Sequence, residues 1–198
     1  MKLNVEDIKR LKNLTGVGLT DAKKALVESE GDFDKALEEM RKKGLTKAEK
    51  RGEREAREGR VGSYVHDNRI GVLVEINCET DFVAKNEKFE TLVKDVAMHI
   101  AASAPEYVSY DDIPEATIKE KANEFTEKAK EQGKPEKMLA NIVDGMLKKY
   151  FAELCLLDQP FIKNPDDTVG DIVKAANAQL GENIVVRRFS RIQLGEVA

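Results

Sequence analysis

The sequence contains no tryptophan and only two cysteines, Cys78 and Cys155. Both lie in apolar stretches, without Cys-x-x-Cys spacing or a neighbouring histidine cluster, as is typical of buried free thiols. The cysteines therefore support neither a disulfide scaffold nor a zinc site. The sequence also lacks a run of about 18 apolar residues, the length that a membrane-spanning helix needs. Because the N-terminal residues lack the apolar core of a signal peptide, we expect a cytoplasmic protein without a membrane partner.

The sequence has no strong excess of either charge. Lysine and arginine number 33 and aspartate and glutamate 37, so the net charge of -4 gives no overall attraction to nucleic acid. Charged residues make up 35% of the chain, and the 41% hydrophobic content is enough to form a core. We expect a globular, helix-rich protein that does not bind nucleic acid directly.

Motifs of common enzyme chemistry are also missing. We find no phosphate-binding Gly-x-x-x-x-Gly-Lys-Ser/Thr, no Gly-x-Gly-x-x-Gly after a strand, no His-Glu-x-x-His and no Gly-x-Ser-x-Gly. The two histidines, His66 and His99, have no nucleophile or metal-ligand spacing beside them, so packing or partner contact is favoured over catalysis. The sequence predicts no catalytic residue, no metal site and no cofactor, and hence a protein that is not an enzyme.

Residues 1–44 have the pattern of three short amphipathic helices. Glycines separate these segments, and Asn4 and Asp32 are suited to begin the first and third helices. A bundle of this size has little core, so we interpret it as a binding module. The predicted apolar faces consist of Val5, Ile8 and Leu11; Ala22, Ala25 and Leu26; and Phe33, Ala36, Leu37 and Met40.

Residues 45–60 continue a strongly basic stretch that begins at Arg41. Glutamates are interspersed with the basic side chains, and there is no aromatic residue on which a base could stack. A solvated linker is therefore favoured over a nucleic-acid patch.

Residues 61–198 alternate strand and helix signals and predict an α+β domain with a mainly antiparallel sheet. Residues 61–66 and 70–78 form a predicted β-hairpin, because alternate residues of the second run are apolar. Short strands are also expected at 154–157 and 183–194.

The helices of this domain are predicted from apolar residues at helical spacing. Asn86 caps one such helix, and residues 115–150 form a predicted antiparallel helical hairpin. Thr168 and Asp171 resemble a capping box at the start of a last helix, which Gly181 ends.

Phe82 occupies an unusual place, beside Asp81 where a strongly apolar strand gives way to a helix. Turns of this kind are usually polar and solvated. The ring is therefore either packed back onto its own core or displayed for another molecule, and the residue pattern alone slightly favours packing onto the core.

Several separated motifs together resemble the bacterial elongation factor Ts family, the guanine-nucleotide exchange factors of elongation factor Tu. The resemblance covers nearly the whole chain, and the motifs occur in the family's order. They are Thr15-Gly16-Val17-Gly18-Leu19-Thr20-Asp21-Ala22-Lys23-Lys24-Ala25-Leu26 with Gly31-Asp32, Asn77-Cys78-Glu79-Thr80-Asp81-Phe82-Val83-Ala84, Met98-His99-Ile100-Ala101-Ala102, Gln159-Pro160-Phe161, and Gly181-Glu182-Asn183-Ile184-Val185-Val186-Arg187-Arg188.

The resemblance implies a three-helix ubiquitin-associated-like domain (1–44), a basic linker (45–60), and an α+β core and dimerisation domain (61–198) that includes the helical hairpin. It implies binding to GDP-bound and nucleotide-free elongation factor Tu, dislocation of the partner's magnesium ion, and GDP release so that GTP can bind. For a short member it also implies a homodimer within a two-plus-two complex. The segment that inserts into the partner would be Thr80, Asp81, Phe82 and Val83. Further implied contacts are His99, Thr15, Gly16, Gly18, Asp21, Lys23 and Lys24.

Three other functions compete with nucleotide exchange. An adaptor would use residues 1–44 for some other partner but would leave the core unexplained. An RNA-binding translation accessory protein would use the basic residues 42–60 together with Arg187, Arg188 and Arg191, although arginines on an edge strand also discourage aggregation. A hydrolase is disfavoured, because the sequence shows no coherent catalytic site.

Overall fold

The computed structural model describes residues 4–15, 19–39 and 54–196. Contacts group the chain into two compact units. One comprises Met1–Arg60, Asn77–Glu90 and Val173–Val185, and the other comprises Val61–Ile76, Thr91–Ile172 and Val186–Ala198. The domain boundaries placed at residues 44 and 60 stay predictions, since most of the expected linker lies outside the described residues.

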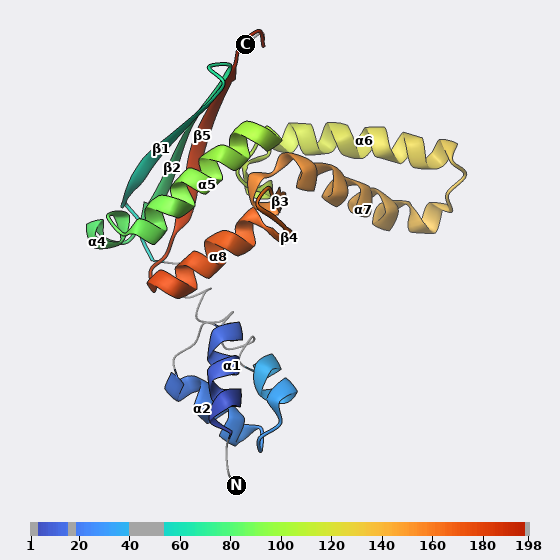
Figure 1. Cartoon of the computed structure of the whole chain (residues 1–198). Coiled ribbons are helices and arrows are strands. Elements are labelled where there is room, and N and C mark those ends of the chain that lie inside the picture. Colours follow the sequence, from blue (N-terminus) through green and yellow to red (C-terminus); the bar gives the residue numbers. More distant parts are fainter. Residues whose placement is uncertain (1–3, 16–18, 40–53, 197–198) are drawn as a thin grey trace. The chain divides into compact units, whose positions relative to one another are not determined.

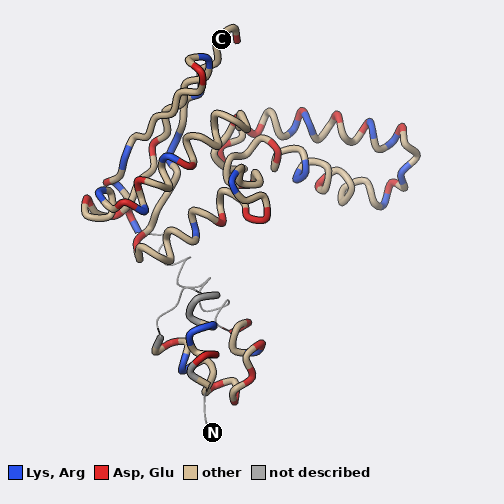
Figure 2. The backbone as a smooth tube through the Cα atoms, in the orientation of Figure 1, with Lys and Arg blue, Asp and Glu red and all other residues tan. Residues whose placement is uncertain are grey.

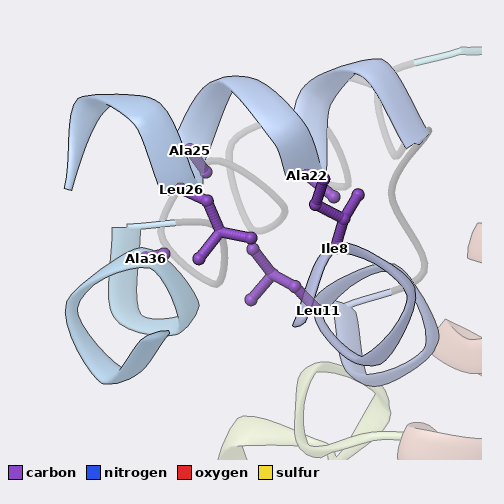
Figure 3. Packing of buried hydrophobic residues seen from close by; sticks show 6 residues of the cluster. All are labelled: Ile8, Leu11, Ala22, Ala25, Leu26 and Ala36. Atoms are coloured by element: carbon purple, nitrogen blue, oxygen red, sulfur yellow. The ribbon is translucent and has the colours of Figure 1, made fainter. Parts of the chain in front are cut away.

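The N-terminal segment contains α1 (Val5–Thr15), α2 (Leu19–Glu28) and a helix over residues 33–39. The Asn4 side chain accepts a hydrogen bond from the Glu6 amide at 3.0 Å, as expected of an N-cap. These helices agree with the three predicted from apolar stripes separated by glycines, although Met40 of the third stripe lies outside the described residues. Their likeness to a ubiquitin-associated domain stays a prediction. Their buried side chains point toward one another in Figure 3 and comprise Ile8, Leu11, Ala22, Ala25, Leu26 and Ala36.

A three-stranded antiparallel sheet has the order β1-β2-β5, with β1 at Glu58–His66, β2 at Ile70–Cys78 and β5 at Val185–Gln193. The turn between β1 and β2 has positive φ at Asp67 and Asn68, 47° and 55°, as a type I′ hairpin turn requires. The predicted hairpin is thereby confirmed. Its first strand begins at Glu58, earlier than predicted and inside the segment assigned to the linker.

Helix α5 (Glu87–Ser103) lies along one face of this sheet (Figure 1). The Asn86 side chain accepts a hydrogen bond from the Lys88 amide at 2.9 Å, which confirms the predicted cap. Packing is close enough that a Cβ atom placed on Gly62 of β1 would lie 2.2 Å from Val93 Cγ1. The buried face of α5 comprises Phe89, Leu92, Val93, Val96, Ala97, His99, Ile100 and Ala101.

Helices α6 (Glu115–Glu131) and α7 (Glu136–Leu154) lie side by side in Figure 1, joined by residues 132–135. Acidic and basic residues are interspersed along both helices in Figure 2, as on well-solvated surfaces. Aromatic rings of Tyr110, Phe125, Tyr150 and Phe151 meet edge to face at centroid separations of 5.2–5.8 Å. Contact between Phe125 of α6 and Tyr150 of α7 packs the two helices against each other.

The strand expected at 154–157 is wrong. Helix α7 continues to Leu154, and a short 3₁₀ turn follows at Leu156–Asp158. Only Cys155 makes an isolated bridge, to Tyr107. An apolar run of this length fits a buried helix end as well as a strand, so its periodicity does not distinguish the two.

A small antiparallel pair, β3 (Pro160–Phe161) and β4 (Asn164–Thr168), was not predicted. It leads directly into α8 (Val169–Leu180). At this junction the Asp171 carboxylate accepts from the Thr168 amide and hydroxyl, while Thr168 Oγ1 accepts from the Asp171 amide at 3.1 Å. The predicted capping box is confirmed.

Candidate functional site

The segment Thr80–Val83 forms a compact helical turn at the end of β2. Thr80 is the N-cap of α4 (Asp81–Ala84), and its backbone is extended at φ -131° and ψ 155°. Its side-chain oxygen accepts a hydrogen bond from the Val83 amide at 3.4 Å. Sequence patterns had predicted a direct strand-to-helix turn here and missed α4, because four residues are too few to show a period.

Phe82 is exposed over 83% of its surface. Val83 is half-buried and Ala84 is buried, so the turn is attached through its last residues and presents the ring to solvent. A ring this exposed contributes little to the core, and such residues often mark interaction sites. Packing of the ring onto the core, which the residue pattern alone favoured, is therefore wrong, since the ring is exposed to solvent.

Asp81, next to the ring, is paired with Lys85 one helical turn later. The Lys85 ammonium donates to Asp81 Oδ2 at 2.7 Å. This hydrogen bond and the charge of Lys85 lower the pKa of Asp81 below its ordinary value. The carboxylate beside Phe82 is therefore ionised at neutral pH.

Two groups hold the inner side of the turn. The Arg60 guanidinium donates to the carbonyl oxygen of Ala84 at 2.6 Å and pairs with Glu90 at 3.3 Å. The Cys78 thiol donates to the carbonyl oxygen of Thr80 at 3.1 Å, and burial raises its pKa to about 11. Cys78 is therefore a protonated structural thiol rather than a nucleophile.

A second loop, Gly181–Asn183, is tied to the same turn. The Glu182 carboxylate accepts hydrogen bonds from the backbone amides of Glu79 and Thr80 at 3.0 and 3.1 Å, and from the Thr80 hydroxyl at 2.6 Å. In return, Glu79 Oε1 accepts from the Asn183 amide at 2.7 Å. The sequence marked both segments as motifs, but it gave no sign that they meet.

His99 is wholly buried, with 0% of its surface exposed. Its Nε2 lies 2.9 Å from Gln159 Oε1, and its Nδ1 accepts from the Ile162 amide at 3.2 Å. Because Nδ1 accepts a backbone N–H, Nε2 carries the proton and the ring is neutral. A contact between this ring and a partner stays a prediction, and it would require the ring to become exposed.

The environment of His99 predicts that stability falls in mild acid. Burial lowers the pKa of His99 below its ordinary value of 6.5, so below that pH the unfolded chain binds a proton that the folded chain does not. The contribution of the neutral His99 to the free energy of unfolding is complete above pH 6.5, and below that pH it decreases by at most about 1.4 kcal/mol per pH unit. Urea unfolding from pH 5 to 7.5 measures the slope, which His99→Gln should reduce. A slope in His99→Gln equal to that of the wild type would contradict the assignment.

The remaining predicted contacts lie in the N-terminal helices. Lys23 and Lys24 are exposed on α2, where Asp21 is half-buried in the first turn. Thr15 is the last residue of α1. The structure thus brings three of these residues together on one helix, while Gly16 and Gly18 lie outside the described residues.

Residues 4–15, 19–39 and 54–196 contain no group of three or more His, Cys, Asp and Glu side chains that could hold a metal ion. Within the same ranges, no helix combines the length and apolar character that crossing a membrane demands.

Comparison with known proteins identifies the family. The family model described as "Elongation factor TS" matches residues 21–196. The chain belongs to the elongation factor Ts family. It is 48% identical over 196 residues to elongation factor Ts of Alkaliphilus oremlandii, an alignment that covers 99% of this chain and 91% of that relative. Elongation factor Ts of Geobacter sulfurreducens is 47% identical over 197 residues, with the same two coverages. The relative from Thermodesulfovibrio yellowstonii is 48% identical, and the match covers 98% of its length.

The resemblance inferred from separated motifs is therefore confirmed over nearly the whole chain. Membership of the elongation factor Ts family places the chain in translation elongation, within protein biosynthesis. It implies a nucleotide exchange factor for elongation factor Tu, a role that needs binding rather than covalent chemistry.

Proposed function

We propose that this chain binds GDP-loaded elongation factor Tu, inserts the turn Thr80–Val83 beside the nucleotide site, dislocates magnesium and thereby releases GDP so that GTP can bind. The observation that carries the proposal is the 83% exposed ring of Phe82 on a turn fixed by hydrogen bonds. Family membership supplies the partner.

Magnesium explains how a small insertion can have a large effect. The ion requires a near-ideal octahedron of oxygen ligands and bridges nucleotide phosphates to protein oxygens. A ring that enters beside this site and shifts the surrounding backbone distorts the octahedron. GDP then loses part of its binding energy, although no covalent bond changes.

The acceleration of GDP release that Phe82 can supply by itself is limited. Burying one phenylalanine yields about 1.5–3 kcal/mol, and each tenfold gain in release rate requires about 1.4 kcal/mol. The ring therefore accounts for roughly two decades at most. Any larger acceleration needs a broad interface, to which the exposed Lys23 and Lys24 on α2 would contribute.

Fluorescent GDP tests the proposal. Elongation factor Tu loaded with the labelled nucleotide is mixed with the full chain and excess unlabelled GDP, and the loss of fluorescence is followed by stopped flow. We expect release to accelerate with chain concentration and to reach a plateau. Release at the intrinsic rate throughout the concentration series would overturn the proposal.

Family resemblance implies that a short member forms a homodimer, and we further propose that the two copies pair through the open face of the sheet. This face, opposite α5, presents the exposed apolar side chains of Val61, Val65, Leu73 and Ile192. A surface hollow of about 300 Å³ lies among β1, β2 and β5. Arg188 and Glu75 form an ion pair at 2.7 Å beside it, which lowers the cost of covering both charges. In a dimer with two-fold symmetry, each copy contributes the same surface to the interface, so this apolar face would pack against its equivalent on the second copy.

Substitution at the centre of this face tests the pairing. Leu73→Lys places a charge on the central strand β2 and should convert a dimer into a monomer in sedimentation velocity at micromolar concentration. Met138→Lys is the matched control, because both side chains are 54% exposed and Met138 lies on α7. A monomeric wild type, or a Leu73→Lys variant that remains dimeric, would contradict the proposed surface.

A further inference from the structure

We infer that Glu182 is the positioning residue for Phe82, and that its carboxylate holds the inserting turn in a binding-competent shape before the partner arrives. The inference rests on the proposed exchange function and assigns to the Gly181–Asn183 loop a role in it. It follows from the hydrogen bonds at the end of β2, the way α8 ends, and the exposure of the ring.

The first observation is the set of donors that Glu182 satisfies. The Glu79 and Thr80 amides point at Oε2 from 3.0 and 3.1 Å, and the Thr80 hydroxyl donates to Oε1 at 2.6 Å. An ionised carboxylate only accepts hydrogen bonds, and bonds to it are stronger than neutral ones. Glu182 therefore fixes both the backbone and the rotamer of Thr80, the residue that caps the turn.

The second observation is that Glu182 is itself held. Helix α8 ends at Leu180, and Gly181 takes a φ of +78°, a left-handed conformation that favours glycine. The Gly181 amide donates to the Asn177 carbonyl oxygen at 3.0 Å, and the Asn177 side chain accepts from the Ile184 amide at 3.1 Å. The end of α8 thus aims the carboxylate at the turn.

The hydrogen bonds between the Gly181–Asn183 loop and the turn after β2 run in both directions. Glu79 Oε1 accepts from the Asn183 amide at 2.7 Å, so a glutamate of each loop binds backbone amides of the other. Asn183 also donates to the Arg54 carbonyl oxygen at 2.7 Å, and Arg54 lies 3.6 Å from Glu79. The turn is therefore anchored from residues about a hundred positions away in the chain.

Anchoring is needed because Phe82 cannot anchor itself. With 83% of the side chain in solvent, packing gives the ring almost no fixed position. A turn that is already ordered avoids losing conformational entropy when it binds, which raises the population of complexes in which the ring is inserted. Loosening the turn should lower the plateau rate of GDP release more than it changes the concentration needed for half the plateau.

Glu182→Gln is the test substitution, because it keeps the side chain's size but replaces one acceptor oxygen by a donor. In the full chain we expect the plateau rate of labelled-GDP release to fall roughly three- to tenfold, as loss of charge-assisted hydrogen bonds suggests. Glu182→Asp keeps the charge and should give an intermediate plateau. Asp171→Asn, which weakens the cap at the other end of α8, is the control and should leave the plateau unchanged.

A double-mutant cycle separates positioning from general destabilisation. In a Phe82→Ala background, Glu182→Gln should lower the plateau no further, because the ring through which it acts is gone. Amide hydrogen exchange gives a readout independent of activity, in which the Glu79 and Thr80 amides should lose protection in Glu182→Gln. Should that variant fail to fold, Glu182→Asp, which keeps the charge on a shorter side chain, should lower the plateau in the same direction and should likewise lower it no further in the Phe82→Ala background.

The outcomes distinguish this inference from the function on which it rests. A wild-type chain that does not accelerate GDP release overturns both. If the wild-type chain accelerates GDP release but Glu182→Gln leaves the plateau rate unchanged, the positioning role alone is overturned. The same holds if Glu182→Gln lowers the plateau equally in the wild-type and Phe82→Ala backgrounds.

Discussion

Phe82→Ala should slow GDP release from elongation factor Tu by roughly 10- to 100-fold at saturating chain concentration, the most that one buried phenylalanine can supply. The ring is 83% exposed in the free chain, so truncation removes almost no packing. Stability should therefore change by no more than about 0.5 kcal/mol. Stopped-flow release of labelled GDP measures the first quantity and urea unfolding the second.

Met138→Ala is a control for the loss of an exposed apolar side chain, since Met138 is 54% exposed on α7. It should leave the release rate at the wild-type value. A wild-type rate in Phe82→Ala would remove the ring from the mechanism, and a fall in both variants would indicate a nonspecific effect of the substitutions.

Gly62→Ala should destabilise the fold by about 1–3 kcal/mol, the usual cost of overpacking a core. The added methyl carbon would lie 2.2 Å from Val93 Cγ1 and 3.5 Å from the Val93 carbonyl oxygen. Valine is restricted at χ1, so its side chain cannot easily turn away. Either α5 or β1 must therefore move, and the loss should appear in the urea unfolding curve.

Gly71→Ala provides the matched control. Gly71 lies in the neighbouring strand β2, and a methyl group there would meet nothing within 4 Å. We expect its stability to stay within about 0.5 kcal/mol of the wild type. Equal losses in the two variants would show that both reflect loss of glycine in a strand rather than contact with α5.

The sequence predicted those strands and helix caps that depend only on residues close together in the chain. Alternating apolar residues predict a strand at Ile70–Cys78, and the structure gives β2 those same limits. The caps at Asn86 and Thr168 were also found, since a capping side chain bonds backbone only two or three residues away. Such features need no knowledge of the rest of the chain.

The residue pattern favoured a packed Phe82 and was wrong, because the turn that exposes the ring is fixed from far along the chain. Glu182 bonds Thr80 across 102 positions, and no spacing rule relates them. The Gly181-Glu182-Asn183 motif was visible only as a family resemblance. Its role becomes clear once the end of α8 and the end of β2 are seen together.

Two short segments were misassigned for a related reason. Residues 154–157 form an apolar run that suits a strand, but α7 extends to Leu154. Strand β4 (Asn164–Thr168) is polar and largely exposed, so it carries no alternating signal. Both outcomes depend on neighbours supplied by tertiary packing.

The central claim is that the chain and GDP oppose each other on elongation factor Tu through binding energy alone. Thermodynamic linkage requires the coupling to be reciprocal: the chain must weaken GDP binding by the same factor by which GDP weakens binding of the chain. Calorimetric titration of the chain into GDP-bound and nucleotide-free elongation factor Tu, paired with GDP titrations with and without the chain, measures both factors. We predict weaker binding of the chain to the GDP-bound form and two equal factors. Equal affinity for the GDP-bound and nucleotide-free forms would contradict the account.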